Sequence, residues 1–69
     1  MIIRPEKYGD MLNYIGSSCR EYRLKYMNMT MAQVAKRLNR SVNIISLFER
    51  GLLDSGYILM FYIKEGLIL

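Results

Sequence analysis

Two helical patterns separated by only a few residues constrain this chain more than any other feature. They lie in the segment Thr30–Gly51, TMAQVAKRLNRSVNIISLFERG. Val34 and Leu38 are four residues apart, a spacing that places apolar atoms on one face of a helix. Ala35 lies at the centre of the same helix, where a small side chain lets a second helix cross closely. The segment therefore predicts a short helix that packs against the helix following it.

The second helix of this pair has clear start and end signals. Ser41 is a good N-cap, because its hydroxyl can accept a hydrogen bond from a free backbone N–H of the first turn. Ile45 and Phe48 fall on the inward side, and Gly51 suits the position just after the helix end. We therefore expect a tight turn followed by a helix over Val42–Arg50.

This arrangement resembles the helix-turn-helix of the phage repressor/Cro-type (Xre-like) family, whose members bind operator DNA. In that family, a helix with the pattern T-Q-x-x-L-A precedes a turn, and a recognition helix ending in I-S-x-[WF]-E-x-G follows. The matching residues are Thr30, Val34 and Ala35 in the first helix, Leu38 at the turn, and Ile45, Ser46, Phe48, Glu49 and Gly51 in the second. The resemblance covers about residues 15–67. It implies an all-α, lambda-repressor-like DNA-binding domain of four to five short helices, with the helix-turn-helix at about 30–51.

The resemblance also implies roles for individual residues. Arg23 and Glu49 fit a structural ion pair between an earlier helix and the recognition helix. The residues expected to contact bases in the major groove are Val42, Asn43, Ser46 and Leu47. Those expected to contact phosphates are Thr30, Met31, Lys36, Arg37, Arg40, Ser41 and Arg50. The implied partner is double-stranded DNA, read by a sequence-specific transcriptional regulator of a phage or a bacterium.

The expected recognition helix is more apolar than is usual in the family. Asn43 is its only amide and can pair with adenine N6 and N7, while Val42 and Leu47 can contact thymine methyl groups. An A·T-rich half-site would suit these side chains. The alternative is a helix-turn-helix scaffold that binds a protein partner, as an antirepressor, inhibitor or antitoxin-like protein would. In that case Val42, Ile44 and Leu47 would anchor an apolar interface.

Positive charge is concentrated on the same part of the chain, within a formal net charge of +4. Seven basic residues lie between positions 20 and 50, namely Arg20, Arg23, Lys25, Lys36, Arg37, Arg40 and Arg50. The acids of that stretch are only Glu21 and Glu49. This distribution favours a phosphate-binding surface, although basic side chains also simply solubilise an exposed helix face.

Composition limits the other classes of function. The 69 residues make one domain, residues 1–69, with a single cysteine, Cys19, and no histidine. These counts exclude an internal disulfide framework and leave too few ligands for a usual zinc site. The carboxylates are scattered, so we expect neither an enzyme nor a cofactor. The longest apolar run, Tyr57–Ile63, is too short to span a bilayer, and MIIRPEKYGD has no signal-peptide core. We expect a cytoplasmic protein, in a bacterial cell or a phage-infected host, that has no contact with a membrane.

Further helices are predicted on both sides of the helix-turn-helix. The first starts at Asp10 as N-cap, and Pro5 can start an earlier turn. Its apolar stripe consists of Leu12, Ile15, Cys19, Tyr22 and Tyr26. Cys19 is interpreted as a small core residue, because no histidine is present to activate it. A loop is expected over Met27–Met29, and a last helix over Ser55–Lys64 that Gly66 ends.

The last helix is apolar on all sides, which predicts cover on both faces. The inward positions are expected to be Tyr57, Met60, Phe61 and Ile63, and the outward ones Ile58, Leu59 and Tyr62. The outward set is the predicted interface of a homodimer, with added apolar surface from Met1-Ile2-Ile3 and Leu67-Ile68-Leu69. The alternative is a short terminal segment that folds back over this helix within one monomer.

Overall fold

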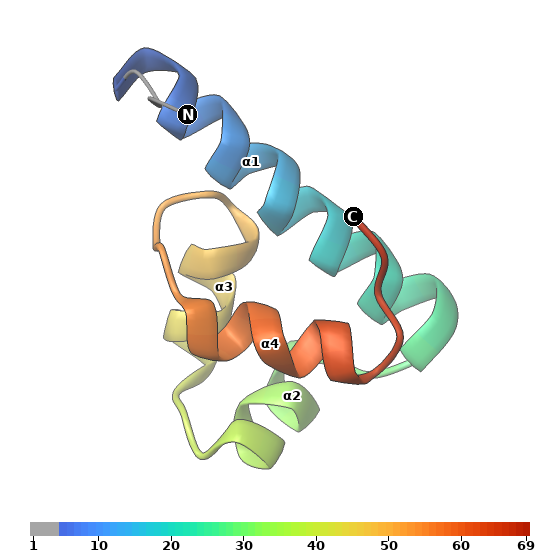
Figure 1. Cartoon of the computed structure of the whole chain (residues 1–69). Coiled ribbons are helices and arrows are strands. Elements are labelled where there is room, and N and C mark those ends of the chain that lie inside the picture. The colour runs from blue at the N-terminus through green and yellow to red at the C-terminus, as the bar shows by residue number, and fades with distance from the viewer. Residues whose placement is uncertain (1–4) are drawn as a thin grey trace.

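Four α-helices and one π-helical turn make up the part of the chain that the structure, a computed structural model, describes: the backbone of residues 5–69 and the side chains of residues 7–69. The elements are α1 (Pro5–Tyr22), the π turn (Arg23–Met27), α2 (Met31–Leu38), α3 (Val42–Glu49) and α4 (Gly56–Lys64) (Figure 1). No strand occurs in this range, which confirms the predicted all-α class. Met1-Ile2-Ile3, which we predicted to add apolar surface to the dimer interface, lies outside the described residues.

The first helix is longer than the sequence predicted. α1 begins at Pro5, whose missing N–H costs nothing in the first turn, so Asp10 lies inside the helix and the prediction of an N-cap there was wrong. Cys19 is fully buried, as expected, but Tyr26 is 74% exposed, so its predicted place on the apolar stripe was also wrong. The reason is the π turn, whose i→i+5 hydrogen bonds rotate its side chains away from the α-helical spacing.

Local hydrogen bonds explain where α2 and α3 begin and end. Thr30 caps α2 in a capping box, in which its Oγ1 accepts from the Gln33 N–H at 3.1 Å and the Gln33 side chain accepts from the Thr30 N–H at 2.8 Å. The turn to α3 starts at Asn39, which is left-handed with φ 55°, and ends at Ser41, whose Oγ accepts from the Ile44 N–H at 3.2 Å. The predicted cap at Ser41 is confirmed.

The end of α3 also agrees with the sequence to within one residue. The helix ends at Glu49 and Arg50 follows as its C-cap, whereas the prediction ran through Arg50. Gly51 has φ 76°, a left-handed conformation that glycine adopts without steric cost, and its N–H donates to the Phe48 carbonyl at 3.1 Å. The predicted role of Gly51 is therefore confirmed.

The orientation of α4 differs from the predicted one, although Phe61, predicted to point inward, is half-buried and packs against the core. Ile58 and Tyr62 are 1% and 0% exposed, so neither can belong to the predicted dimer interface. Leu59 is half-buried and packs against the core, while Tyr57, Met60 and Ile63, predicted to point inward, are exposed. Because α4 is apolar on all sides, periodicity did not define its inward face.

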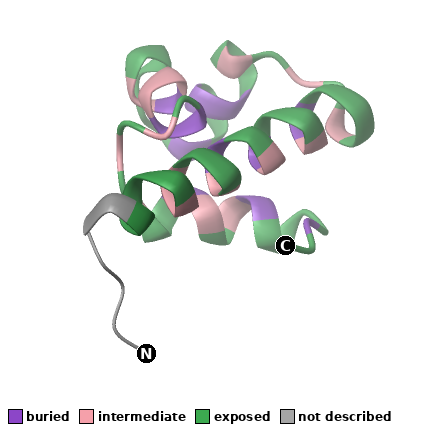
Figure 2. Ribbon diagram, turned by 90° about the horizontal axis from the view of Figure 1, so that it is seen from above, coloured by how far each residue is buried: buried purple, intermediate pink, exposed green. Residues whose placement is uncertain are grey.

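The core consists of side chains from all four helices and from the segment after α4 (Figure 2). Its buried apolar residues are Cys19, Val34, Ala35, Leu38, Ile45, Phe48, Ile58, Tyr62 and Leu67. After α4 the chain turns at Gly66, with φ 113°, and the Leu67 N–H donates to the Tyr62 carbonyl at 3.0 Å. The terminal segment then runs back beside the second half of α1 (Figure 1), leaving the outer face of α4 open.

Candidate functional site

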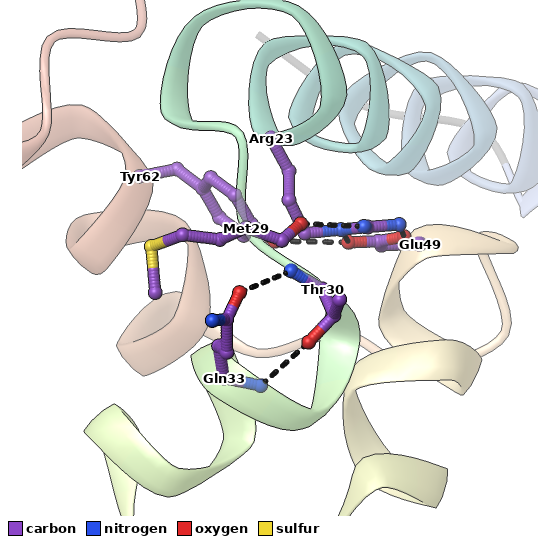
Figure 3. Close-up of polar contacts among 6 residues, drawn as sticks. All are labelled: Arg23, Met29, Thr30, Gln33, Glu49 and Tyr62. Atoms are coloured by element: carbon purple, nitrogen blue, oxygen red, sulfur yellow. Dashed lines mark hydrogen bonds and ion pairs between the residues drawn. The ribbon is translucent and has the colours of Figure 1, made fainter.

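A buried ion pair fixes the C-terminal end of α3. The Arg23 Nε and Nη2 atoms donate to the two carboxylate oxygens of Glu49 at 2.8 and 2.9 Å, as the resemblance implied (Figure 3). Arg23 Nη1 also donates to the Met29 carbonyl at 2.9 Å, just before the N-cap of α2. Both charged residues are 5% exposed. A single guanidinium therefore ties the end of α3 to the start of α2.

Tyr62 joins this ion pair, a contact that the sequence analysis did not predict. We call Arg23, Glu49 and Tyr62 the buried centre. The Tyr62 hydroxyl donates to Glu49 Oε2 at 2.9 Å, which links α4 to the ion pair (Figure 3). The available signal was that a buried tyrosine hydroxyl needs a hydrogen-bond partner. Within the described residues, every fully buried side-chain nitrogen and oxygen has such a partner. The site thus holds three helices and the π turn in one arrangement.

The buried centre shifts the pKa values of Arg23 and Tyr62 and that of Cys19. The hydrogen bond to Glu49 raises the pKa of Arg23, so its positive charge is secure. Burial, and then the charge of Glu49, raise the pKa of Tyr62 and raise that of the Cys19 thiol to about 12. Because Cys19 stays a neutral thiol at physiological pH and is fully buried, its reading as a core residue agrees with the structure.

The first turn of α3 presents its side chains to solvent. Val42 is 44% exposed and Asn43 is exposed, whereas Ser46 and Leu47, one turn later, are half-buried. Ile45, on the opposite face, is fully buried. The structure thus brings the four predicted base-contacting residues to one helix, with the first two more accessible than the other two.

The four cations among the predicted phosphate-contacting residues divide into three groups. Lys36 and Arg50 are exposed, while Arg37 Nη1 pairs with Glu65 Oε1 at 3.0 Å. The Arg40 guanidinium carbon lies 4.7 Å from the centre of the Tyr57 ring, a cation–π contact.

The remaining predicted phosphate contacts lie at the starts of α2 and α3. The side-chain oxygens of Thr30 and Ser41 are already used as caps, and Met31 is half-buried. Each cap hydroxyl accepts from one N–H of its helix, and Gln33 also accepts from the Thr30 N–H; the other first-turn N–H groups have no partner within an α-helix. These groups are available to an anion. The Gln33 half of the capping box was missed, although T-x-x-Q is a capping-box pattern.

Comparison of the chain with protein-family models, curated proteins and solved structures finds no significant match. Over residues 5–69, no helix has the length and apolar character needed to cross a bilayer. In the same range, no three histidine, cysteine or carboxylate side chains gather where they could hold a metal ion. The side chains around α3 are therefore the basis for assigning a function.

Proposed function

We propose that the chain is a sequence-specific DNA-binding regulator whose helix-turn-helix, α2 and α3, places α3 in the major groove. The observation that carries this proposal is the two-sided character of α3. Its inner face is fixed by Ile45 and by the Glu49 carboxylate, and its first turn presents Val42 and Asn43 to solvent. A short helix whose inner face is packed against the core and whose first turn has accessible side chains suits readout of base edges.

The accessible residues would make two kinds of contact with DNA, to base edges and to phosphates. Asn43 offers the only amide on α3 and can bind adenine through N6 and N7, while Val42 can contact a thymine methyl group. Lys36 and Arg50, with the N-termini of α2 and α3, would contact phosphates and set the register. Arg37 is already paired with Glu65 through Nη1, so Lys36 is the better phosphate ligand. The proposed location is the cytoplasm of a bacterial cell.

Lys36→Ala is expected to weaken binding to duplexes of any sequence and to lower the slope of log Kd against log salt by about one. The reason is that one phosphate contact, and hence one released counterion, is lost. Fluorescence anisotropy on a random duplex over a range of salt concentrations measures this slope. Lys7→Ala, on the exposed start of α1, is the matched control and should leave it unchanged. A wild-type chain that does not bind random duplex at low salt would contradict the proposal.

The proposed regulator would act as a homodimer, because one small module contacts too little DNA for useful affinity. Tyr57, Met60 and Ile63 are exposed along α4 at spacings of three residues, and the exposed Lys64 lies beside them at the end of the helix. Beside them, Leu38, Met60, Phe61 and Lys64 help to line a hollow of about 170 Å³, which can receive a side chain of a second copy. A two-fold axis through this face would pair it with itself.

Replacing both Met60 and Ile63 with lysine is expected to give a folded monomer with much weaker DNA binding. Sedimentation velocity at micromolar concentration, with and without duplex, measures the association state. Ile68→Lys is the control, because Ile68 is 91% exposed on the terminal segment and outside the proposed face. If the wild-type chain stays monomeric with and without DNA, the α4 face is not a self-association surface.

The second candidate function is protein binding through the apolar side chains of α3. The apolar character of Val42, Ile44 and Leu47 favours it, because such residues anchor protein interfaces. However, Ile44 and Leu47 are both half-buried, and Ile44 packs against the core, which leaves Val42 as the main exposed apolar side chain of the three. The structure therefore offers little apolar area for an interface on this face, and DNA binding is the better-supported proposal.

A further inference from the structure

A hollow of about 620 Å³ lies on the side of α2, and its lining combines methionines with cations. The lining residues are Met27, Asn28, Met29, Gln33, Lys36 and Arg37. Met27 and Met29 are half-buried and rest on the hydrophobic core, so the apolar part of the lining is backed by packed side chains. Figure 3 shows the Met29 side chain leading away from the buried ion pair, on the side where Gln33 lies.

The loop that forms this hollow is held in place by the buried centre. The Met29 carbonyl accepts from Arg23 Nη1 at 2.9 Å, and the Asn28 N–H donates to the Arg23 carbonyl. Asn28 is left-handed, with φ 52°, a conformation that asparagine adopts more readily than most residues and that ends the π turn here. The Thr30–Gln33 capping box fixes the next residues. The two methionines are therefore presented by a preorganised loop, which reduces the entropic cost of binding.

The charges around the hollow select the chemistry of an occupant. Lys36 and Arg37 are both exposed at its rim, and among the residues that the structure describes no carboxylate lines it. Arg37 already binds one carboxylate, that of Glu65, from the α4 side at 3.0 Å. Thioether side chains adapt to varied apolar partners and are common at surfaces that bind many peptides. The apolar lining and the positively charged rim therefore complement a segment that has an apolar side chain flanked by carboxylates.

We propose that this hollow binds an acidic amphipathic segment of another protein, with an apolar side chain against Met27 and Met29 and carboxylates on Lys36 and Arg37. A DNA duplex presents phosphates but no side chain that can enter between the methionines. A second copy of this chain is disfavoured at a cationic rim, because it carries the same net charge of +4. The site does not depend on the proposed DNA binding. Lys36 is also one of the proposed phosphate ligands, so a protein partner at this site would compete with DNA for that side chain.

Methyl NMR of the full chain labelled at the methionine methyl groups tests this site. The probe is a short acetylated peptide of leucine and glutamate, with leucine at helical spacing, and the matched peptide has lysine in place of glutamate. The expected result is that the glutamate peptide shifts the Met27 and Met29 methyl signals and leaves Met60, on α4, unchanged. The lysine peptide is expected to shift none of them.

Charge reversal at the rim provides the second arm of the test. The double variant Lys36→Glu and Arg37→Glu is expected to weaken binding of the glutamate peptide by about tenfold or more, as loss of close charge pairs does. Lys7→Glu with Arg20→Glu makes the same change in net charge on the exposed surface of α1 and should bind like wild type. Circular dichroism confirms that both variants are folded.

Four results would overturn the proposal. Equal shifts with both peptides would indicate nonspecific apolar contact, and shifts at Met60 alone would move the site to α4. Shifts of the Met27 and Met29 methyl signals on addition of random duplex DNA alone would assign the hollow to nucleic acid. Shifts of Met27 and Met29 that depend on protein concentration without any peptide would assign it to a second copy.

Discussion

Glu49→Ala is expected to cost about 3–5 kcal/mol of folding free energy, the range found when one partner of a buried ion pair is removed. The Glu49 carboxylate accepts two hydrogen bonds from Arg23 and one from Tyr62. Its loss leaves a charged guanidinium, 5% exposed, and a buried hydroxyl without their acceptor. Domains are stable by only about 0.1 kcal/mol per residue, so a loss of this size would remove about half of the stability of a 69-residue chain.

Urea denaturation followed by circular dichroism measures this loss, and the chain contains a matched control. Glu65→Ala also removes a carboxylate from an arginine, but the Arg37–Glu65 pair is on the surface, with side-chain exposures of 58% and 35%. That change is expected to cost less than about 1 kcal/mol. If the two variants unfold at the same urea concentration, the buried pair does not hold α3 as the geometry indicates.

Local signals predicted the parts of the fold that depend on neighbouring residues. The Ser41 cap and the left-handed Gly51 follow from side-chain and backbone properties at single positions, and both agree with the structure. The Arg23–Glu49 pair joins residues 26 apart, and it was reached through the family resemblance rather than through spacing. The all-helical class followed from the same signals.

The errors concern features that tertiary packing decides. α4 has no polar face, so nothing in its sequence marked Ile58 and Tyr62 as the buried side. In the folded chain, the Tyr62 hydroxyl donates to the buried Glu49 carboxylate, a contact that is consistent with this side of α4 facing inward. Tyr26 was misplaced because the sequence gives no visible sign of the π turn. In both cases the period of the apolar residues was read correctly as helical, but the direction of the side chains was not.

The candidate site was predictable to a similar extent. The exposure of Val42 and Asn43 followed from the inward positions of Ile45 and Phe48 on the same helix. The contacts of the cations did not, because Arg37 meets a residue 28 positions away in the chain and Arg40 packs on the Tyr57 ring. The sequence alone therefore does not show which cations are available to bind phosphates, because these contacts form only in the folded chain.

Gly16→Ala and Gly9→Ala, both within α1, are expected to change stability in opposite directions. Gly16 is buried where α1 crosses the end of α3, and a Cβ there would lie 2.5 Å from the Phe48 carbonyl oxygen and 2.6 Å from that of Glu49. Backbone oxygens cannot rotate away, so the two helices must separate. We expect a net loss of about 1–3 kcal/mol, as for overpacked cores, despite the better helix propensity of alanine.

Gly9 provides the control, because a Cβ there has no neighbour within 4 Å. Gly9→Ala should therefore stabilise the chain by up to about 1 kcal/mol through helix propensity alone. Thermal unfolding of both variants measures the two effects in one helix. Moving α1 away from α3 also pulls Arg23, which follows α1, away from the Glu49 carboxylate. Gly16→Ala is thus expected to weaken the hold on α3, and equal melting of the two variants would show that α1 and α3 do not meet as closely as this.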